Sequence, residues 1–301
     1  MIQLKRMLYL YNPAAGSHEH AYSMDRIVER FQRQNVLIQP YRLHETDEPA
    51  FLDRLLTEAS DGIVVCGGDG TVNHIVNRMM PCKVTAPLGI IPAGTCNDFS
   101  RSLSIPHNVD KCIDLICGGI VMGVDAGIIN ESSYFVNTFA GGQVVGVSYN
   151  THPELKRNFG PVAYYLQAVG EVANIRPFRI KIDIGSEIVE EDALVFVVLN
   201  GKDAAGLSNL IHRADLRDGM MDILVVRKCT HIELASLFFK ALTRMPMEDR
   251  HLMYLRTSSC IIETKRSILT SVDGEKGPRL PVSIRFLHQA LNVFVPPDHS
   301  Q

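Results

Sequence analysis

Apolar runs that end directly in glycine-rich turns are the feature that most limits how this chain can fold. In the first 120 residues, four runs are predicted to be strands, at residues 7–11, 36–43, 63–66 and 88–91, and all but the second end in such turns. Helical patterns separate them, with apolar stripes such as Ile27, Val28 and Phe31. Strands that are apolar along their whole length and alternate with helices are typical of a parallel sheet covered on both faces. We therefore expect an α/β domain over residues 1–120.

Three of these runs lead into turns that are rich in glycine or proline. The first turn runs from Asn12 and Pro13 to Gly16, the second spans residues 67–73, and the third spans residues 92–99. Ligands of parallel sheets bind beyond the carboxyl ends of the strands, which is where all three turns fall. The pattern predicts one binding site built from three loops.

The second turn, Gly67-Gly68-Asp69-Gly70-Thr71-Val72-Asn73, has the composition of a phosphate-binding loop. Its glycines allow close backbone approach, and N–H groups at a helix start bind anions. Asp69 would repel a phosphate unless a cation lay between them, and Mg2+ meets that need. A dinucleotide fingerprint is excluded because Asn73 stands where glycine is required, and no Gly-Lys-Ser/Thr P-loop occurs. Taken alone, the motif is equally consistent with a tight turn capped by aspartate.

From about residue 121 the pattern changes to strand-like runs, several of which alternate apolar and polar residues. The runs cover residues 133–138, 179–184, 193–199, 221–226, 260–264, 283–286 and 291–295. Two helices are predicted among them, near residues 162–173 and 232–243, and the apolar stripe from Ile232 to Leu242 is interpreted as core. This pattern predicts a second, antiparallel domain over residues 121–301, whose last strand, at about 290–301, can return to the first domain.

Composition excludes several classes of protein. A net charge of −3 without a basic cluster argues against nucleic-acid binding. Seven cysteines, an odd number without a Cys-x-x-Cys pair, argue against a disulfide framework and a zinc site and fit a reducing cytoplasm. No targeting segment is visible, and no apolar run makes a good bilayer helix.

The three turns together resemble the motifs of a known family. Asn12-Pro13-Ala14-Ala15-Gly16, Gly67-Gly68-Asp69-Gly70-Thr71-Val72-Asn73 and Pro92-Ala93-Gly94-Thr95-Cys96-Asn97-Asp98-Phe99, followed by Arg101, are similar to three blocks of the bacterial diacylglycerol kinase catalytic-domain family. These are soluble lipid kinases related to sphingosine and ceramide kinases. The resemblance spans about residues 7–296. It implies a parallel α/β domain like that of NAD kinases and diacylglycerol kinases, followed by a mainly antiparallel β-sandwich.

The resemblance also implies a set of site residues. Those that would bind ATP are Asn12, Pro13, Gly16, Gly67, Gly68, Asp69, Gly70, Thr71, Asn73, Gly94, Thr95, Asn97, Asp98 and Arg101. In the second half, residues 214–222 resemble the family's structural magnesium loop, with Asp218 as side-chain ligand and Asp215 and Met220 contributing oxygens. Three aspartates within this loop suit a hard cation, although the spacing alone also fits a solvated turn.

Asp273-Gly274-Glu275 resembles the family's catalytic Asp-Gly-Glu, although Asp-Gly by itself is a common hairpin turn. The resemblance implies that Asp273, Glu275 and Asp69 are catalytic. ATP would lie in the cleft between the domains, and Asp273 would accept the proton of an attacking lipid hydroxyl. Glu275 would hold the metal or share the role of base.

The sequence thus predicts an ATP- and Mg2+-dependent kinase of diacylglycerol or a related lipid, which produces phosphatidate. It would be cytoplasmic, would contact the membrane peripherally during turnover, and by resemblance would form a homodimer. Two alternatives stay open. One is a kinase of a soluble substrate, as in NAD kinases, and the other is a nucleotide-binding regulator without catalysis.

Overall fold

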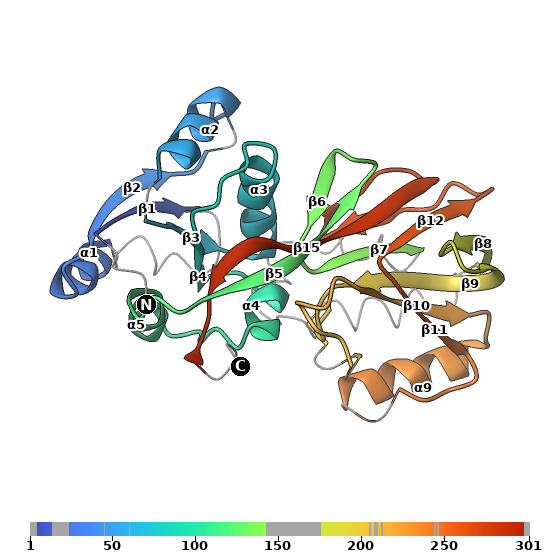
Figure 1. Cartoon of the computed structure of the whole chain (residues 1–301). Coiled ribbons are helices and arrows are strands. Elements are labelled where there is room, and N and C mark those ends of the chain that lie inside the picture. The colour runs from blue at the N-terminus through green and yellow to red at the C-terminus, as the bar shows by residue number, and fades with distance from the viewer. Residues whose placement is uncertain are drawn as a thin grey trace. The chain divides into compact units, whose positions relative to one another are not determined.

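The structure of the chain is a computed structural model that describes residues 5–13, 24–44, 46–59, 61–142, 176–204, 206–207, 210–211, 213–243, 245 and 247–297 (Figure 1). The chain divides into two compact units, one of Met1–Val124 with Gln289–Gln301 and one of Asp125–His288. The boundaries between the units lie inside two long strands, β5 (Val121–Ile129) and β15 (Val282–Phe294).

A parallel sheet forms the centre of the first unit. Its strand order is β2 (Leu37–Arg42), β1 (Arg6–Tyr11), β3 (Ile63–Gly67) and β4 (Leu88–Pro92), and the C-terminal end of β15 lies parallel to β4. Every residue of β3 and β4 is buried. Because both faces of these strands are covered, their sequences are continuously apolar rather than alternating. The predicted parallel sheet is confirmed.

The helices of the first unit cover both faces of that sheet. They are α1 (Met24–Arg33), α2 (Pro49–Glu58), α3 (Asp69–Met79), α4 (Asp98–Ser102) and α5 (Val109–Cys117). Helix α1 packs with α5 and α2 packs with α3, and Figure 1 places the two pairs on opposite faces. The strand order explains this, because right-handed crossovers that run in opposite directions along a sheet put their helices on opposite faces.

Antiparallel strands dominate the second unit. Their path is β14 (Glu275–Lys276), β13 (Thr270–Val272), β7 (Thr138–Gly142), β9 (Ile188–Leu199), β8 (Phe178–Asp183), β12 (Ser259–Thr264) and β15. Strand β10 (Met221–Arg227) pairs with β9 and β11 (Leu252–Thr257), and β6 (Ser133–Phe135) pairs with β5. Phe135, Phe139, Phe178 and Phe196 are among the residues that fill the core. The predicted fold class is therefore confirmed in both halves.

Two predictions about strands are wrong in detail. Residues 133–138 form two strands instead of one, because the N–H groups of Val136 and Asn137 donate to the carboxylate of Asp273 and not to a neighbouring strand. The two strands predicted at 283–286 and 291–295 are one strand, β15. The exposed residues His288 and Gln289 lie inside it, so apolar content alone did not mark this part as strand.

A third prediction, that the stripe from Ile232 to Leu242 is core, is correct for only part of the stripe. Helix α9 (His231–Leu242) buries Leu234, Leu237 and Ala241, whereas Ile232 is 83% exposed and Phe239 is 62% exposed. The helix is apolar around most of its circumference, so its sequence did not indicate which face meets the protein. The helix predicted at 162–173 lies outside the described residues. Among the described helices, none is both long enough and apolar enough to span a bilayer.

Candidate functional site

The structure brings together the three predicted turns of the first unit. Strands β1, β3 and β4 end level with one another, because Tyr11 is paired with Cys66 and Cys66 with Ile91. The N–H of Asn12 donates to the carbonyl of Cys66 (3.1 Å), and the N–H of Ala93 donates to the carbonyl of Gly67 (2.9 Å). Asn12 also donates through Nδ2 to Oγ1 of Thr71 (3.2 Å). Pro13 lies in the first turn, and Gly16 lies outside the described residues.

Glycine is required where the second and third turns meet. A Cβ on Gly94 would lie 2.5 Å from Cα of Gly68, and a Cβ on Gly68 would lie 3.0 Å from Cα of Gly94. A Cβ on Gly67 would lie 2.5 Å from the side chain of Thr71. The two backbones therefore touch directly, and any side chain at these positions would push the turns apart.

Asp69 ties these same two turns together. It lies in the first turn of α3, and its carboxylate accepts the N–H groups of Asp98 (3.1 Å) and Phe99 (3.2 Å) at the start of α4. Burial raises the pKa of Asp69, and the two hydrogen bonds and the nearby guanidinium of Arg101 oppose that rise. One role of Asp69 visible in the structure is thus to cap α4 from a neighbouring loop.

Asn97 and Asp98 support the third turn from within. Asn97 is buried with a positive φ of 51°, and its side chain accepts the N–H of Gly94 (2.9 Å) and donates to the carbonyl of the same residue (2.8 Å). Asp98 is also buried and pairs with Arg101 at 2.5 Å. Thr95, in contrast, is exposed. The turn is rigid at its base and presents Thr95 to solvent.

The start of α3 is suited to an anion. Gly68 is its N-cap residue and provides no side-chain cap, so the first N–H groups of the helix have no such partner there. Asn73 lies one turn further along the helix. Its side-chain oxygen accepts a hydrogen bond from Nδ2 of Asn77 (3.1 Å), one turn later in the same helix. Backbone N–H groups at a helix start, beside closely packed glycines, are the arrangement that binds phosphate.

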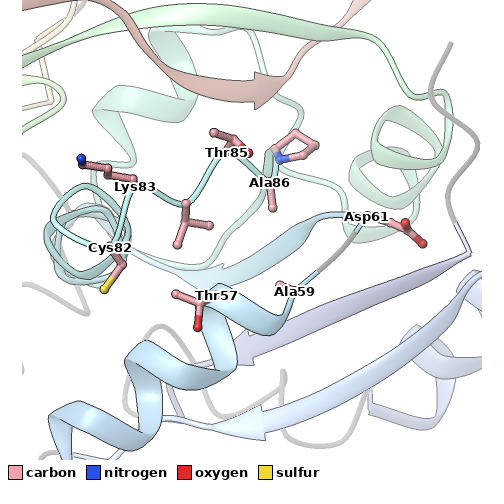
Figure 2. Close-up of a pocket in the computed structure, with 9 residues that line it drawn as sticks. Thr57, Ala59, Asp61, Cys82, Lys83, Thr85 and Ala86 are labelled. Atoms are coloured by element: carbon pink, nitrogen blue, oxygen red, sulfur yellow. The ribbon is translucent and has the colours of Figure 1, made fainter.

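A hollow of 340 Å³ in the same unit lies elsewhere (Figure 2). Asp61 and Pro87, which line it, come just before β3 and β4 begin. It is therefore at the amino ends of the strands, at the opposite edge of the sheet from the glycine turns. It takes no part in the site described above.

In the second unit, Asp273 lies at the tip of the hairpin formed by β13 and β14. Asp273 and Gly274 both have positive φ angles, 46° and 89°, as a two-residue hairpin turn requires. The carboxylate of Asp273 is buried and accepts three backbone N–H groups, from Val136 (2.8 Å), Asn137 (3.0 Å) and Thr138 (2.7 Å). It therefore anchors the segment between β6 and β7 to the hairpin.

Glu275 differs from Asp273 in its surroundings. It opens β14, opposite Val272, and it is exposed. The two predicted catalytic carboxylates thus share one hairpin, but one is held by the backbone and the other faces solvent. A substitution at Asp273 will disturb the structure as well as any chemistry.

The predicted magnesium loop is a compact turn. Asp215 accepts the N–H of Arg217 (3.0 Å), Asp218 accepts the N–H of Met220 (2.8 Å), and Asp218 also pairs with Arg256. Among the described residues, no group of three or more His, Cys, Asp or Glu side chains could hold a metal ion. A cation here would bind to the carboxylate of Asp218, in competition with Arg256, and to backbone oxygens and water. The metal roles of Asp215, Asp218 and Met220 stay a prediction.

Sequence reasoning missed Asp125, which is completely buried in β5. Its carboxylate accepts the N–H of Gly219 (2.6 Å) and lies 3.2 Å from Nδ1 of His288. Its carbonyl and that of Val136 accept from Nδ2 of Asn200, at 2.7 and 2.8 Å. Asp125 thus connects the loop of Asp218 to the segment that Asp273 anchors. A lone aspartate in an otherwise apolar run was the signal that could have revealed it.

Comparison with known proteins gives consistent results for both halves of the chain. The family described as "Diacylglycerol kinase catalytic domain" matches residues 6–129, and the one described as "YegS C-terminal NAD kinase beta sandwich-like domain" matches residues 144–295. A diacylglycerol kinase of Bacillus subtilis is 27% identical over 99% of both chains. One from Staphylococcus saprophyticus is 31% identical over 98% of this chain and 96% of its own.

Comparison with solved structures also finds diacylglycerol kinases. A crystal structure of a candidate diacylglycerol kinase from Bacillus anthracis superimposes with a TM-score of 0.85. It is 29% identical, and the alignment covers 99% of each chain. The likeness therefore extends over both units and is not confined to the glycine turns.

Proposed function

Because this chain belongs to the diacylglycerol kinase catalytic-domain family and is therefore a lipid kinase, we propose that it transfers the γ-phosphate of Mg-ATP to the hydroxyl of diacylglycerol. The product would be phosphatidate. One observation carries the proposal most directly. The three turns meet at the carboxyl edge of the parallel sheet. Asp69 and the Gly68–Gly94 contact join the second and third turns, and Asn12 joins the first turn to Thr71 of the second.

In this proposal the first unit binds the nucleotide. The N–H groups of residues 68–71 and the hydroxyl of Thr95 contact the phosphates, and Asn12 supports them through its bond to Thr71. Asp69 and Asn97 fix the shape of the two loops. Mg2+ bound with ATP would neutralise charge on the phosphates. Preorganised donors and neutralised charge are the main requirements of phosphoryl transfer, which involves little covalent work by the protein.

The hairpin of β13 and β14 would supply the proton acceptor. The lipid hydroxyl loses its proton to a carboxylate while its oxygen forms a bond to the γ-phosphorus, and the bond from that phosphorus to the ADP oxygen breaks. Asp273 and Glu275 are the two candidates for this role. If Asp273 is the acceptor, its three N–H donors fix the position of its carboxylate. If Glu275 is the acceptor, Asp273 acts by positioning the hairpin.

The test is transfer of labelled γ-phosphate from Mg-ATP to diacylglycerol, ceramide, sphingosine and monoacylglycerol in mixed micelles, with NAD in a parallel assay. We expect label in diacylglycerol. The variants Asp273→Asn and Glu275→Gln separate the two carboxylates, and Glu187→Gln is the control, since Glu187 is an exposed carboxylate of the same unit. Glu275 is the acceptor if Glu275→Gln loses turnover while keeping its melting temperature and ATP affinity. Asp273 is the acceptor if Glu275→Gln keeps turnover while Asp273→Asn loses it at a temperature at which that variant is still folded and binds ATP.

A second candidate, a kinase of a soluble substrate, is favoured by one observation, the NAD kinase-like description of the second domain. Label in NAD and none in lipids would support that candidate and overturn the lipid proposal. ATP binding without transfer to any acceptor would support a catalytically silent regulator. The predicted homodimer stays a prediction, and the predicted contact with membranes is developed below.

A further inference from the structure

Helix α9 is firmly attached to the second unit along one face. Its start is set by a capping box, in which Thr230 accepts the N–H of Glu233 and Glu233 accepts the N–H of Thr230. Leu234, Leu237 and Ala241 are buried, and Leu237 packs in a cluster with Leu224 of β10 and Leu252 of β11. The orientation of α9 on its unit is therefore well defined.

The opposite face of α9 carries large apolar side chains in solvent. The exposed fractions are 83% for Ile232, 62% for Phe239, 44% for Leu242 and 51% for Met245, just beyond the helix. Steps of seven and three residues along a helix return to the same side, so Ile232, Phe239 and Leu242 form one stripe. We call these four residues the α9 stripe. They make up four of the ten large apolar residues that are exposed in the described part of the chain.

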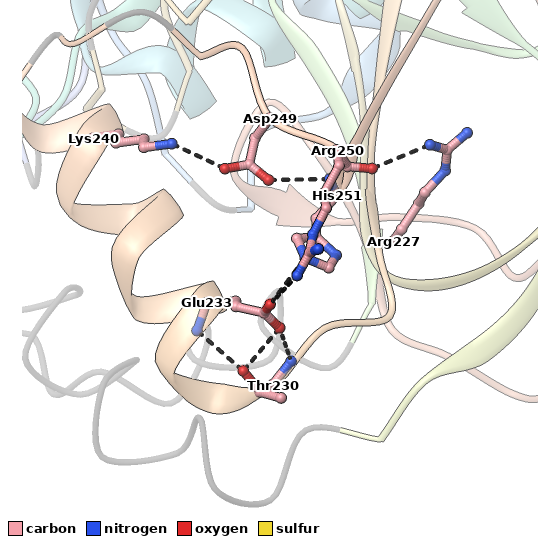
Figure 3. Close-up of polar contacts among 7 residues, drawn as sticks. All are labelled: Arg227, Thr230, Glu233, Lys240, Asp249, Arg250 and His251. Carbon is pink, nitrogen blue, oxygen red and sulfur yellow. Dashed lines mark hydrogen bonds and ion pairs between the residues drawn. The ribbon is translucent and has the colours of Figure 1, made fainter.

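Glu233 and Lys240 follow Ile232 and Phe239 directly in the chain, and both pair with residues after the helix (Figure 3). Glu233 pairs with Arg250 at 2.7 Å and lies 3.2 Å from His251, and Lys240 pairs with Asp249 at 2.9 Å. The carboxylates beside the stripe are thus neutralised by partners. The exposed Lys228, three residues before α9, adds one positive charge, and it forms no ion pair with the described residues. A helix with an exposed apolar face whose neighbouring carboxylates are paired has the features of a helix that lies in a lipid interface.

The size of the stripe argues against a stable protein partner. A helix of 12 residues is about 18 Å long, and with a diameter of about 10 Å its exposed side covers about 180 Å². A stable protein interface buries about 800 Å² on each partner. Interfacial helices, in contrast, bind lipid through one apolar face that enters the headgroup boundary by about 5–10 Å, while lysine and arginine side chains reach the headgroups.

We propose that the α9 stripe is the surface through which this protein docks on a lipid bilayer, with Ile232 and Phe239 entering the region below the headgroups. The choice of lipid as the occupant rests on the proposed function, because a kinase of a membrane lipid must meet its substrate at the bilayer. The exposed Lys228, just before α9, suits anionic headgroups, which attract Lys and Arg near the surface.

The chain contains no tryptophan, so one introduced residue gives a fluorescence signal of its own. Phe239→Trp places the indole in the stripe, and Leu37→Trp places it at an equally exposed site on β2 of the first unit, since both residues are 62% exposed. With vesicles of phosphatidylcholine and phosphatidylglycerol, we expect a blue shift for Phe239→Trp and none for Leu37→Trp. No shift for Phe239→Trp, or equal shifts for both, would overturn the proposal.

Sedimentation with the same vesicles gives the affinity. Two exposed side chains carry most of the stripe, so the double variant Ile232→Gln/Phe239→Gln should bind at least about tenfold more weakly than wild type. Leu37→Gln should bind as wild type does. Both variants should keep the wild-type melting temperature, since the replaced side chains are exposed. Equal vesicle binding by the double variant and wild type would refute the docking surface.

Two further readouts distinguish the docking surface from the lipid-kinase proposal and from a subunit interface. Sedimentation requires no turnover, so its result holds whether or not the lipid-kinase proposal is correct. If both proposals are correct, the double variant loses activity on diacylglycerol in vesicles but keeps it on diacylglycerol in detergent micelles. If the wild type is a dimer in size-exclusion chromatography and the double variant is a monomer with unchanged vesicle binding, the stripe is a subunit interface and the inference is wrong.

Discussion

Removing the carboxylate of Asp273 should destabilise the second unit enough to be measured. The variant Asp273→Ala leaves three N–H groups, of the buried Val136 and Asn137 and the half-buried Thr138, without the acceptor that binds them at 2.7–3.0 Å. Each unsatisfied buried donor costs about 1–3 kcal/mol. Water can enter beside the exposed Gly274, so we take the lower limit for each donor, which gives a total of about 3 kcal/mol.

The assay is thermal unfolding followed by calorimetry. For a unit of this size, a loss of about 3 kcal/mol lowers the melting temperature by about 6–12 °C. Glu275→Ala is the matched control, because it removes an exposed carboxylate from the same hairpin and should change stability by about 0.5 kcal/mol or less. A melting temperature of Asp273→Ala within about 2 °C of wild type would refute the reasoning, since the three hydrogen bonds would then contribute little.

Three further outcomes follow from the contacts described above. Gly94→Ala should weaken nucleotide binding in calorimetric titration and lower the free energy of unfolding by about 1–3 kcal/mol, because its Cβ would lie 2.5 Å from Cα of Gly68. Unchanged nucleotide affinity would show that the two turns need not touch. Asn200→Ala should lower stability to urea by about 2 kcal/mol or more, because the carbonyls of Asp125 and Val136 lose their donor; an unchanged midpoint would contradict this. The pKa of Glu233 is lowered from 4.5 to about 2 by hydrogen bonds from the backbone and side chain of Thr230 and from Arg250. The ionised Glu233 therefore stabilises the fold above pH 4.5, and this stabilisation is lost as the pH falls to about 2. Glu233→Gln should therefore be less stable than wild type at neutral pH, and the difference should vanish between pH 4.5 and about 2; a difference that is independent of pH would exclude this role.

Several features of the fold could be predicted because they depend on residues close together in the chain. A run of apolar residues before a glycine turn reports a buried strand and its end, and parallel strands bring their carboxyl ends to one edge of a sheet. This is why the turns at Asn12, Gly67–Asn73 and Pro92–Phe99 could be expected to meet. The resemblance of these turns to the diacylglycerol kinase family is confirmed by matches over both halves of the chain.

The roles of individual side chains depended on contacts that the sequence does not encode locally. Asp69 was interpreted as a residue near a cation, yet in the fold its carboxylate also caps a helix that begins 29 residues later. The sequence did not indicate a structural role for Asp125, which lies in an apolar run. That role is visible only in the fold, which buries Asp125 beside Gly219.

What the sequence by itself determined is the alternation of strands and helices in the first half, the strand-rich second half and the positions of the glycine turns, since these depend mainly on neighbouring residues. Only the tertiary structure decided that Asp273 binds N–H groups 135–137 residues away and that α9 leaves Ile232 and Phe239 in solvent. The physical reason is the same in both cases. A hydrogen-bond partner or a covering surface is chosen when distant segments pack, and a side chain's identity states only what it can bind or bury.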